Sequence, residues 1–140
     1  MDKQALLKIA NKYNENTLMQ TLRIEYIDVG TDFLVARMPV DSKVHQPRGF
    51  LHGGATVALA ESVGSAASHM LVDSDTFEIK GIEISANHVR SVRSGFVTAR
   101  AAILHKGRTT HLWQIEIRDE HEKLISFCKL TTMVLKKNNE

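Results

Sequence analysis

The amino-acid sequence predicts an α+β fold in which one antiparallel sheet wraps around a single central helix. Residues 53–72 are predicted to form that helix, and the small residues Ala, Ser, Thr and Gly dominate them. Segments with the period-two alternation of strands precede and follow the helix, and short turns join the later ones. A helix with a small surface can cover one face of a sheet that curls around it. The opposite face would also need cover, which suggests that subunits pair.

Length and composition favour one soluble globular domain over residues 1–140. A chain of about 150 residues buries roughly 70% of its unfolded surface, enough for one core. The net charge of +2 is too small to indicate nucleic-acid binding, and no stretch reaches the ~20 apolar residues that span a bilayer. Cys128 is the only cysteine, and the charged opening segment is unlike a signal peptide. Both observations predict a cytoplasmic protein without disulfides.

Before the central helix, the pattern predicts a short helix and two strands. Residues 5–13 have amphipathic spacing and belong to an N-terminal helical extension, residues 1–20. Residues 21–29 alternate apolar and polar side chains, as expected for a half-buried strand. After a turn, Phe33–Val40 forms the second strand, and a loop at residues 45–49 leads into the helix.

Further strands are expected after the helix, which gives about five or six in the chain. The expected strands are residues 79–89, 96–105, 109–118 and 124–135. Hairpin turns are expected at residues 106–107 and 119–123. Residues 136–140 are expected to form a frayed polar tail.

Glu61 is the only residue with a formal charge between Gly49 and Val72. A carboxylate in the middle of a helix is costly if it is buried and unpaired. Either it lies on an exposed helix face, or it stands at the edge of a pocket as a reacting group. The apolar residues around it favour the pocket. Ser65 lies four residues on, hence on the same face, where its hydroxyl either orients the carboxylate or a water, or only packs.

The sequence His52-Gly53-Gly54 opens the helix. The first turn of a helix has unpaired N–H groups and a partial positive charge, and glycine lets a ligand approach that backbone closely. The Gly53 N–H could therefore hold a carbonyl oxygen as it becomes an oxyanion. Gln46 lies in the loop before the helix, where its amide could bind a carbonyl oxygen or a water. Taken alone, the two glycines, His52 and Gln46 could each have a purely structural role.

Three blocks carry a family resemblance. They are QPRGFLHGGATVALAESVGS from residue 46, GIEISANHVRSVRSG from residue 81, and GRTT from residue 107 with LWQIEI after it. In order and spacing they resemble the PaaI-like thioesterases of the hotdog fold, and most of all the branch with the enterobactin proofreading and 1,4-dihydroxy-2-naphthoyl-CoA thioesterases. The resemblance implies hydrolysis of an acyl-CoA thioester, with an aromatic acyl group favoured and an acyl-carrier-protein substrate left open. Coenzyme A would be part of the substrate, and no cofactor is expected.

The resemblance also implies a site between subunits of a homodimer, commonly within a dimer of dimers. Glu61, as nucleophile or general base, and Ser65 would come from one chain, with Gln46 and His52 from its partner. Gly53 would give its N–H to the thioester carbonyl. His88 would line the acyl pocket. The remaining substrate and coenzyme A contacts would be Gly54, Gly81, Val89, Arg90, Ser91, His105, Lys106, Gly107, Arg108, Thr109 and Thr110.

Alternative functions remain open on the sequence alone. The chain could be a hotdog acyl hydratase, or a non-catalytic module that binds acyl-CoA. No metal site is expected, because the seven histidines show no metal-ligand spacing. Arg48 departs from the family loop, which has a bulky apolar residue there, so its role is open. The four histidines His69, His105, His111 and His121 are expected at the surface, and Cys128 is expected to be buried and inert.

Overall fold

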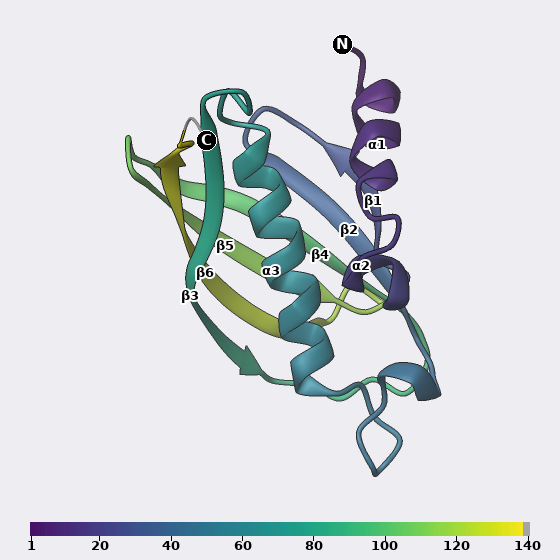
Figure 1. Cartoon of the computed structure of the whole chain (residues 1–140). Coiled ribbons are helices and arrows are strands. Elements are labelled where there is room, and N and C mark those ends of the chain that lie inside the picture. The colour runs from purple at the N-terminus through teal and green to yellow at the C-terminus, as the bar shows by residue number, and fades with distance from the viewer. Residues whose placement is uncertain (139–140) are drawn as a thin grey trace.

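The computed structural model describes residues 1–138, and it confirms the predicted α+β fold. The elements are α1 (Lys3–Lys12), α2 (Leu18–Thr21), β1 (Glu25–Val29), β2 (Phe33–Val40), a 3-10 turn (Ser42–Val44), α3 (Gly53–His69), β3 (Phe77–His88), β4 (Gly95–Lys106), β5 (Thr110–Arg118) and β6 (Leu124–Lys136). The six strands form one antiparallel sheet in the order β1-β2-β4-β5-β6-β3. The sheet curves around α3, which runs along its concave face (Figure 1).

The core lies between α3 and the concave face of the sheet. Buried and partly exposed residues alternate along β5, and Trp113, Ile115 and Ile117 form one buried cluster with Leu59 and Val63 of α3. Burying one such side chain contributes about 1.5–3 kcal/mol. The sheet therefore fixes which face of α3 is covered.

The N-terminal region differs from the prediction. The strand expected at residues 21–29 begins only at Glu25, because Leu18–Thr21 forms the short helix α2. Arg23 follows with a left-handed backbone (φ 59), which breaks the regular extended conformation. Alternating hydrophobicity predicted the strand, but it cannot detect a single residue with positive φ.

The other boundaries are close to the prediction. The central helix ends at His69 rather than Val72. In the turn that follows, the Asp73 side chain accepts hydrogen bonds from the Asp75 N–H and the Thr76 hydroxyl. Strand β6 includes Lys136, which was assigned to the tail. Residues 139–140 of that expected tail lie outside the described residues.

His111 was expected at the surface, and this expectation is wrong. Its side chain is 1% exposed. Side chains alternate between the two faces of a strand, so His111 lies on the same inward face of β5 as Trp113, Ile115 and Ile117. Its Nδ1 lies 3.0 Å from Ser68 Oγ, which also accepts a hydrogen bond from the Trp113 indole N–H at 2.6 Å. Ser68 and Thr132 hydroxyls are 2.7 Å apart. These polar groups join the C-terminal end of α3 to β5 and β6.

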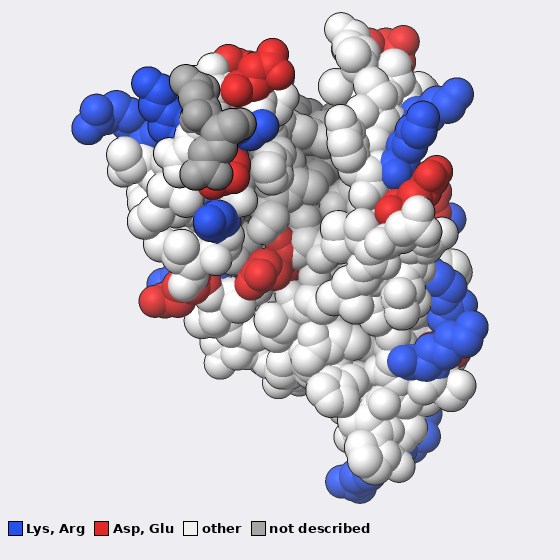
Figure 2. Space-filling model, viewed as in Figure 1, with Lys and Arg blue, Asp and Glu red and all other residues white. Residues whose placement is uncertain are grey.

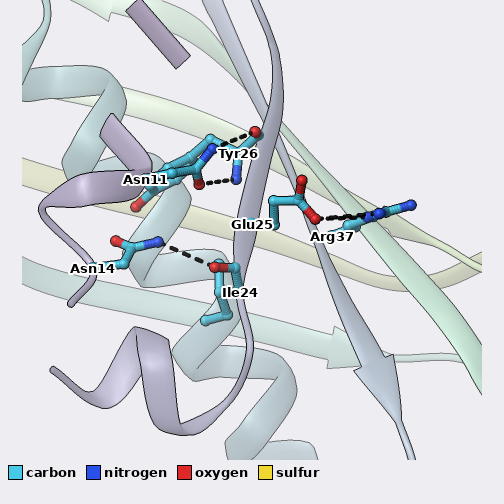
Figure 3. A network of polar contacts seen from close by, with 6 residues as sticks. All are labelled: Asn11, Asn14, Ile24, Glu25, Tyr26 and Arg37. Carbon is cyan, nitrogen blue, oxygen red and sulfur yellow. Dashed lines mark hydrogen bonds and ion pairs between the residues drawn. The ribbon is translucent and has the colours of Figure 1, made fainter. Parts of the chain in front are cut away.

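The outer edge of β1 is bonded by side chains of the N-terminal helix (Figure 3). Asn11 Nδ2 donates to the Tyr26 carbonyl at 3.0 Å, and the Tyr26 N–H donates back to Asn11 Oδ1 at 2.8 Å. Asn14 Nδ2 donates to the Ile24 carbonyl at 3.1 Å. The asparagine amides take the place of a neighbouring strand here, so this edge of the sheet is partly closed within the chain.

The opposite edge of the sheet, β3, is open. Within residues 1–138 no strand pairs with its outer side, and residues 80–83 are exposed, with the Ile82 side chain 52% exposed. A long exposed edge strand is a ready template for pairing with another chain. None of the helices described is long and apolar enough to cross a bilayer.

Candidate active site

The start of α3 leaves the backbone N–H of Gly53 free. His52 is the N-cap residue, and its Nδ1 accepts the Gly54 N–H at 2.8 Å. The His52 carbonyl accepts the Thr56 N–H at 3.1 Å. No acceptor among residues 1–138 meets the Gly53 N–H. The helix dipole makes this free donor suitable for an anionic oxygen.

The cap also fixes how His52 and Gly54 can serve a ligand. Because Nδ1 of His52 accepts a backbone N–H, a neutral ring carries its proton on Nε2 and can donate from there. The Gly54 N–H is already bonded within the chain. Of the two predicted backbone positions, only Gly53 therefore has its N–H available.

The loop before α3 holds Gln46 in a defined orientation. The His52 N–H donates to the Val44 carbonyl at 2.8 Å, and the Leu51 N–H donates to the Val92 carbonyl at 2.7 Å. These two hydrogen bonds anchor the ends of the loop. The backbone N–H of Arg48 donates to the Gln46 side-chain oxygen. That contact leaves the Gln46 amide NH₂ as the free group, a donor suited to a carbonyl oxygen or a water. Arg48 itself is exposed.

Glu61 lies on the side of α3 that faces β3. A Cβ on Gly81 would be 3.4 Å from Glu61 Cδ, so the carboxylate packs over the bare backbone of Gly81. In the single chain Glu61 is exposed, and within residues 1–138 it forms no ion pair. Ser65 is partly buried on the same face one turn on. Position 81 is thus in van der Waals reach of the Glu61 carboxylate.

His88 lies at the other end of β3, against the start of α3. A Cβ on Gly53 would be 3.0 Å from His88 Nε2 and 3.2 Å from its Cδ2. On the opposite side of the ring, Nδ1 is 2.7 Å from the hydroxyl of Ser126. A Cβ at position 53 would be in tight contact with the imidazole, which would have to move by a few tenths of an ångström. Ser126 was absent from the predicted site, and no spacing in the sequence pairs it with His88.

A single chain does not bring Glu61 to the free N–H of Gly53. Eight residues of helix separate them, roughly 12 Å along the axis at 1.5 Å per residue. Reacting groups must approach to about 3–3.5 Å. One thioester carbonyl cannot contact both groups of the same chain.

The predicted coenzyme A contacts also form two separate groups. The N–H groups of Val89 and Arg90 donate to the Ile125 carbonyl, at the start of β6. The β4–β5 hairpin lies at the other end of β6, where the Val134 N–H donates to the Thr109 carbonyl at 2.8 Å. The strand between Ile125 and Val134 spans roughly 30 Å. The exposed residues of the two groups are Val89, Arg90, Ser91, His105, Lys106, Arg108 and Thr109.

Two cavities of the single chain lie away from these residues. One of about 370 Å³ is bordered by the α1–β1 region, and one of about 360 Å³ lies between α1, the β1–β2 turn and the C-terminal end of α3. Neither is lined by a predicted site residue. The face that carries α3 is largely uncharged, with charged side chains mostly toward its margins (Figure 2). The candidate site is therefore an open surface of the monomer.

The structure confirms the expected exposure of three histidines and the expected burial of Cys128. His69, His105 and His121 are exposed. Cys128 is fully buried in β6, and burial raises the pKa of its thiol to about 11. Because the thiolate is the reactive form, a thiol with this pKa is a poor nucleophile at neutral pH.

Comparison with known proteins points to one family. Residues 48–126 match the family described as the thioesterase superfamily. The 1,4-dihydroxy-2-naphthoyl-CoA hydrolase of Escherichia coli strain K12 is 44% identical over 129 residues, which cover 92% of this chain and 94% of that protein. The proofreading thioesterase EntH of Cronobacter turicensis is 43% identical over 129 residues, covering 92% of this chain and 93% of that protein.

Solved structures agree with the fold. The crystal structure of a mutant thioesterase from Pseudomonas aeruginosa superposes with a TM-score of 0.92 at 43% identity and covers 94% of each chain. The PaaI protein of Escherichia coli, from its phenylacetic acid degradation operon, superposes with a TM-score of 0.80 at 21% identity over 91% of this chain and 90% of that one. At that identity the second match supports the fold alone.

Proposed function

This chain belongs to the thioesterase superfamily, has its hotdog fold and is a thioester hydrolase, and from this premise we propose that it hydrolyses aromatic acyl-CoA thioesters with Glu61 as the reacting carboxylate. The observation that carries the proposal is the placement of two half-sites on one open edge strand. The Glu61 carboxylate packs on Gly81 of β3, and the free Gly53 N–H lies beside His88 at the end of the same strand.

Pairing of two copies through β3 would complete the site. Gly81 and His88 are seven residues apart, with the midpoint between Ile84 and Ser85. If a second copy adds its β3 antiparallel about that midpoint, Gly81 of one chain lies opposite His88 of the other. Glu61 of one chain then faces the start of α3 of the second copy. The same twofold pairing brings Arg90 of one chain toward the β4–β5 hairpin of the other.

The proposed chemistry uses the groups left free by the fold. The thioester oxygen accepts from the Gly53 N–H, and Gln46 donates its amide NH₂ to the same oxygen or to the reacting water. Glu61 either attacks the carbonyl carbon, forming a mixed anhydride that water then cleaves, or removes a proton from the attacking water. Both routes consume one water and release a carboxylic acid and the coenzyme A thiol. The thiolate is a good leaving group, so no strong general acid is required.

The aromatic acyl group is proposed from relatives. The 1,4-dihydroxy-2-naphthoyl-CoA hydrolase is 44% identical over nearly the whole chain. A direct comparison would measure thiol release from benzoyl-, 4-hydroxybenzoyl-, 1,4-dihydroxy-2-naphthoyl-, hexanoyl- and palmitoyl-CoA. We expect the aryl thioesters to have the highest kcat/KM. Preference for the alkyl thioesters would contradict the substrate class while leaving the hydrolase intact.

The role of Glu61 is tested with Glu61→Gln, which keeps the size of the side chain and removes its charge and basicity. We expect kcat on the best aryl-CoA to fall by about 10²- to 10⁴-fold with little change in KM. Glu15→Gln, at an exposed position near α1, is the matched control and should keep wild-type kcat. A Glu61→Gln chain with near-normal kcat would remove Glu61 from the chemistry. Wild-type protein that binds acyl-CoA without releasing thiol would contradict the proposed catalytic activity.

A further inference from the structure

We propose that His88 is a second donor to the oxyanion and that the buried hydroxyl of Ser126 positions it. This inference rests on the proposed function, because it assigns a role in the same site. It starts from two contacts of one imidazole ring. Nδ1 is 2.7 Å from Ser126 Oγ, and Nε2 is 3.0 Å from the place where a Cβ on Gly53 would stand.

The register of the sheet holds the two residues together. His88 is the last residue of β3 and lies directly opposite Ser126 of β6. The Ser126 side chain is 0% exposed, and within residues 1–138 its hydroxyl has no hydrogen-bond partner other than His88. His88 itself is exposed, so the ring has one edge anchored in the sheet and the other edge open to a ligand.

The burial of Ser126 decides which ring nitrogen carries the proton. If Nδ1–H donated to Ser126, the serine O–H would be left buried without an acceptor, which costs free energy. If the serine O–H donates to Nδ1, the buried donor is satisfied, and an acceptor with spare lone pairs is tolerated more easily. The second arrangement places the proton of the neutral imidazole on Nε2. The N–H then points to the open side, beside Gly53.

The two donors are close enough to share one oxygen. The Cβ position of a residue is about 2.5 Å from its own nitrogen, so His88 Nε2 lies within about 5.5 Å of the Gly53 nitrogen. Two hydrogen bonds of about 2.9 Å to one oxygen can bridge donors up to roughly 5.8 Å apart. A thioester oxygen at the start of α3 can therefore accept from the Gly53 N–H and the His88 Nε2–H together. His88 would be catalytic in this arrangement, and Ser126 a positioning residue that acts only through it.

The first measurement is the tautomer of His88, read by long-range ¹H–¹⁵N correlation of the imidazole in the intact protein. We expect Nε2 protonated and Nδ1 unprotonated in the wild type, and a mixture of tautomers in Ser126→Ala. Protonation on Nδ1 in the wild type would overturn the inference. This readout does not depend on activity, so it still decides what Ser126 does to His88 if no thioester in the panel is hydrolysed. In that case the proposed function fails, and the oxyanion role fails with it.

The second measurement is a double-mutant cycle on thiol release. Loss of an oxyanion donor lowers kcat by about 10²- to 10³-fold in known cases, which we expect for His88→Ala with little change in KM. Ser126→Ala should lower kcat roughly tenfold through lost orientation of the ring, and Ser126→Thr, which keeps the hydroxyl in a strand, should restore most of it. In the His88→Ala background, Ser126→Ala should have no further effect.

Three results would contradict this account. A twofold or smaller loss of kcat in Ser126→Ala, with the urea midpoint unchanged, would show that the hydroxyl does not position a catalytic group. An additive effect of the two substitutions would mean that Ser126 acts independently of His88. A rise in KM with unchanged kcat in His88→Ala would assign the ring to binding the acyl group and remove it from the oxyanion site.

Discussion

At the scale of single residues, charge and burial separate the predictable positions from the others. Glu61 could be found from the sequence because it is the only formal charge between Gly49 and Val72. Gly53 could be found because a glycine at a helix start is recognisable. Ser126 could not be found, since its partner His88 is 38 residues away in the chain and only the pairing of β3 with β6 brings them together.

His111 shows how a residue-level signal can be present and be missed. It is two residues before Trp113 in β5 and so lies on the same face of the strand, and this alternation predicts that it is buried. The general expectation that histidine lies near the surface led to the opposite assignment. The fold makes a buried histidine tolerable by giving Nδ1 a hydrogen-bond partner in Ser68.

The buried imidazole makes stability depend on pH. Burial, and to a lesser degree the charges of Lys106 and His105, lower the pKa of His111 from its ordinary value of 6.5. As pH falls, the unfolded chain therefore binds a proton before the folded chain does, so the free energy of unfolding should be constant between about pH 7 and 8, below the range in which the Cys128 thiol titrates. It should fall as pH drops through 6.5 toward the lower folded pKa. Urea unfolding followed by Trp113 fluorescence at several pH values measures this slope.

His111→Asn is the variant that tests the assignment. It should reduce the slope between about pH 7 and 5 without abolishing it, because the partial burial of His69 and the nearby charge of Lys137 also lower the pKa of that residue. Hydrogen bonds lower the pKa values of Asp28, Asp41, Asp73 and Asp119 from 3.8. The stability that these carboxylates contribute is lost only below about pH 4, outside the range of the histidines. A slope equal to that of the wild type would contradict a titrating role for His111.

At the scale of elements, the small residues of α3 explain how one helix fits inside a curved sheet. Gly64 is the tightest such position, because a Cβ there would be 2.5 Å from Leu130 Cδ2 and 3.2 Å from Ile115 Cδ1. Both neighbours are fully buried. A side chain at position 64 would therefore force Leu130 or the helix to move.

Gly64→Ala tests this close packing. Overpacking a core costs about 1–3 kcal/mol, and the better helix propensity of alanine returns about 0.5–1 kcal/mol. We expect a net loss of about 1–2 kcal/mol in the free energy of unfolding, measured with urea. Ser62→Ala on the partly exposed side of the same helix is the control, with a change within about 0.5 kcal/mol. Stabilisation by Gly64→Ala would mean that α3 has room to move away from the sheet.

Most elements could be predicted because their cause is local. Alternating side chains predict β2, β5 and β6, and the run of small residues predicts α3. The segment before β1 could not be predicted in the same way. Its form depends on a left-handed backbone at Arg23 and on Asn11 and Asn14 bonding backbone groups of residues 24 and 26, and such contacts leave no periodic pattern.

At the scale of the whole molecule, the two edges of the sheet differ in how their backbone groups are bonded. Asparagine side chains of the N-terminal region bond the β1 edge (Figure 3). Strand β3 is open within residues 1–138; Glu61 packs on its Gly81, and the start of α3 lies beside His88 at its end. The proposed function would give the open edge a role, because Glu61 and Gly53 are far apart in one chain and only a second copy would bring the two groups together. A further association of two such dimers stays a prediction.

The most direct test of this account is complementation between two inactive variants. Glu61→Gln removes the carboxylate, and Gly53→Pro removes the free N–H at a first helical position where proline is tolerated and where the extended backbone of His52 (ψ 132) suits it. Each variant alone, taken through the same unfolding and refolding, should be nearly inactive on an aryl-CoA. Mixed one to one, they should recover roughly a quarter of wild-type activity, because half of the randomly formed dimers are mixed and each has one complete site. A mixture no more active than its components would place Glu61 and Gly53 of the same chain in one site and contradict the account.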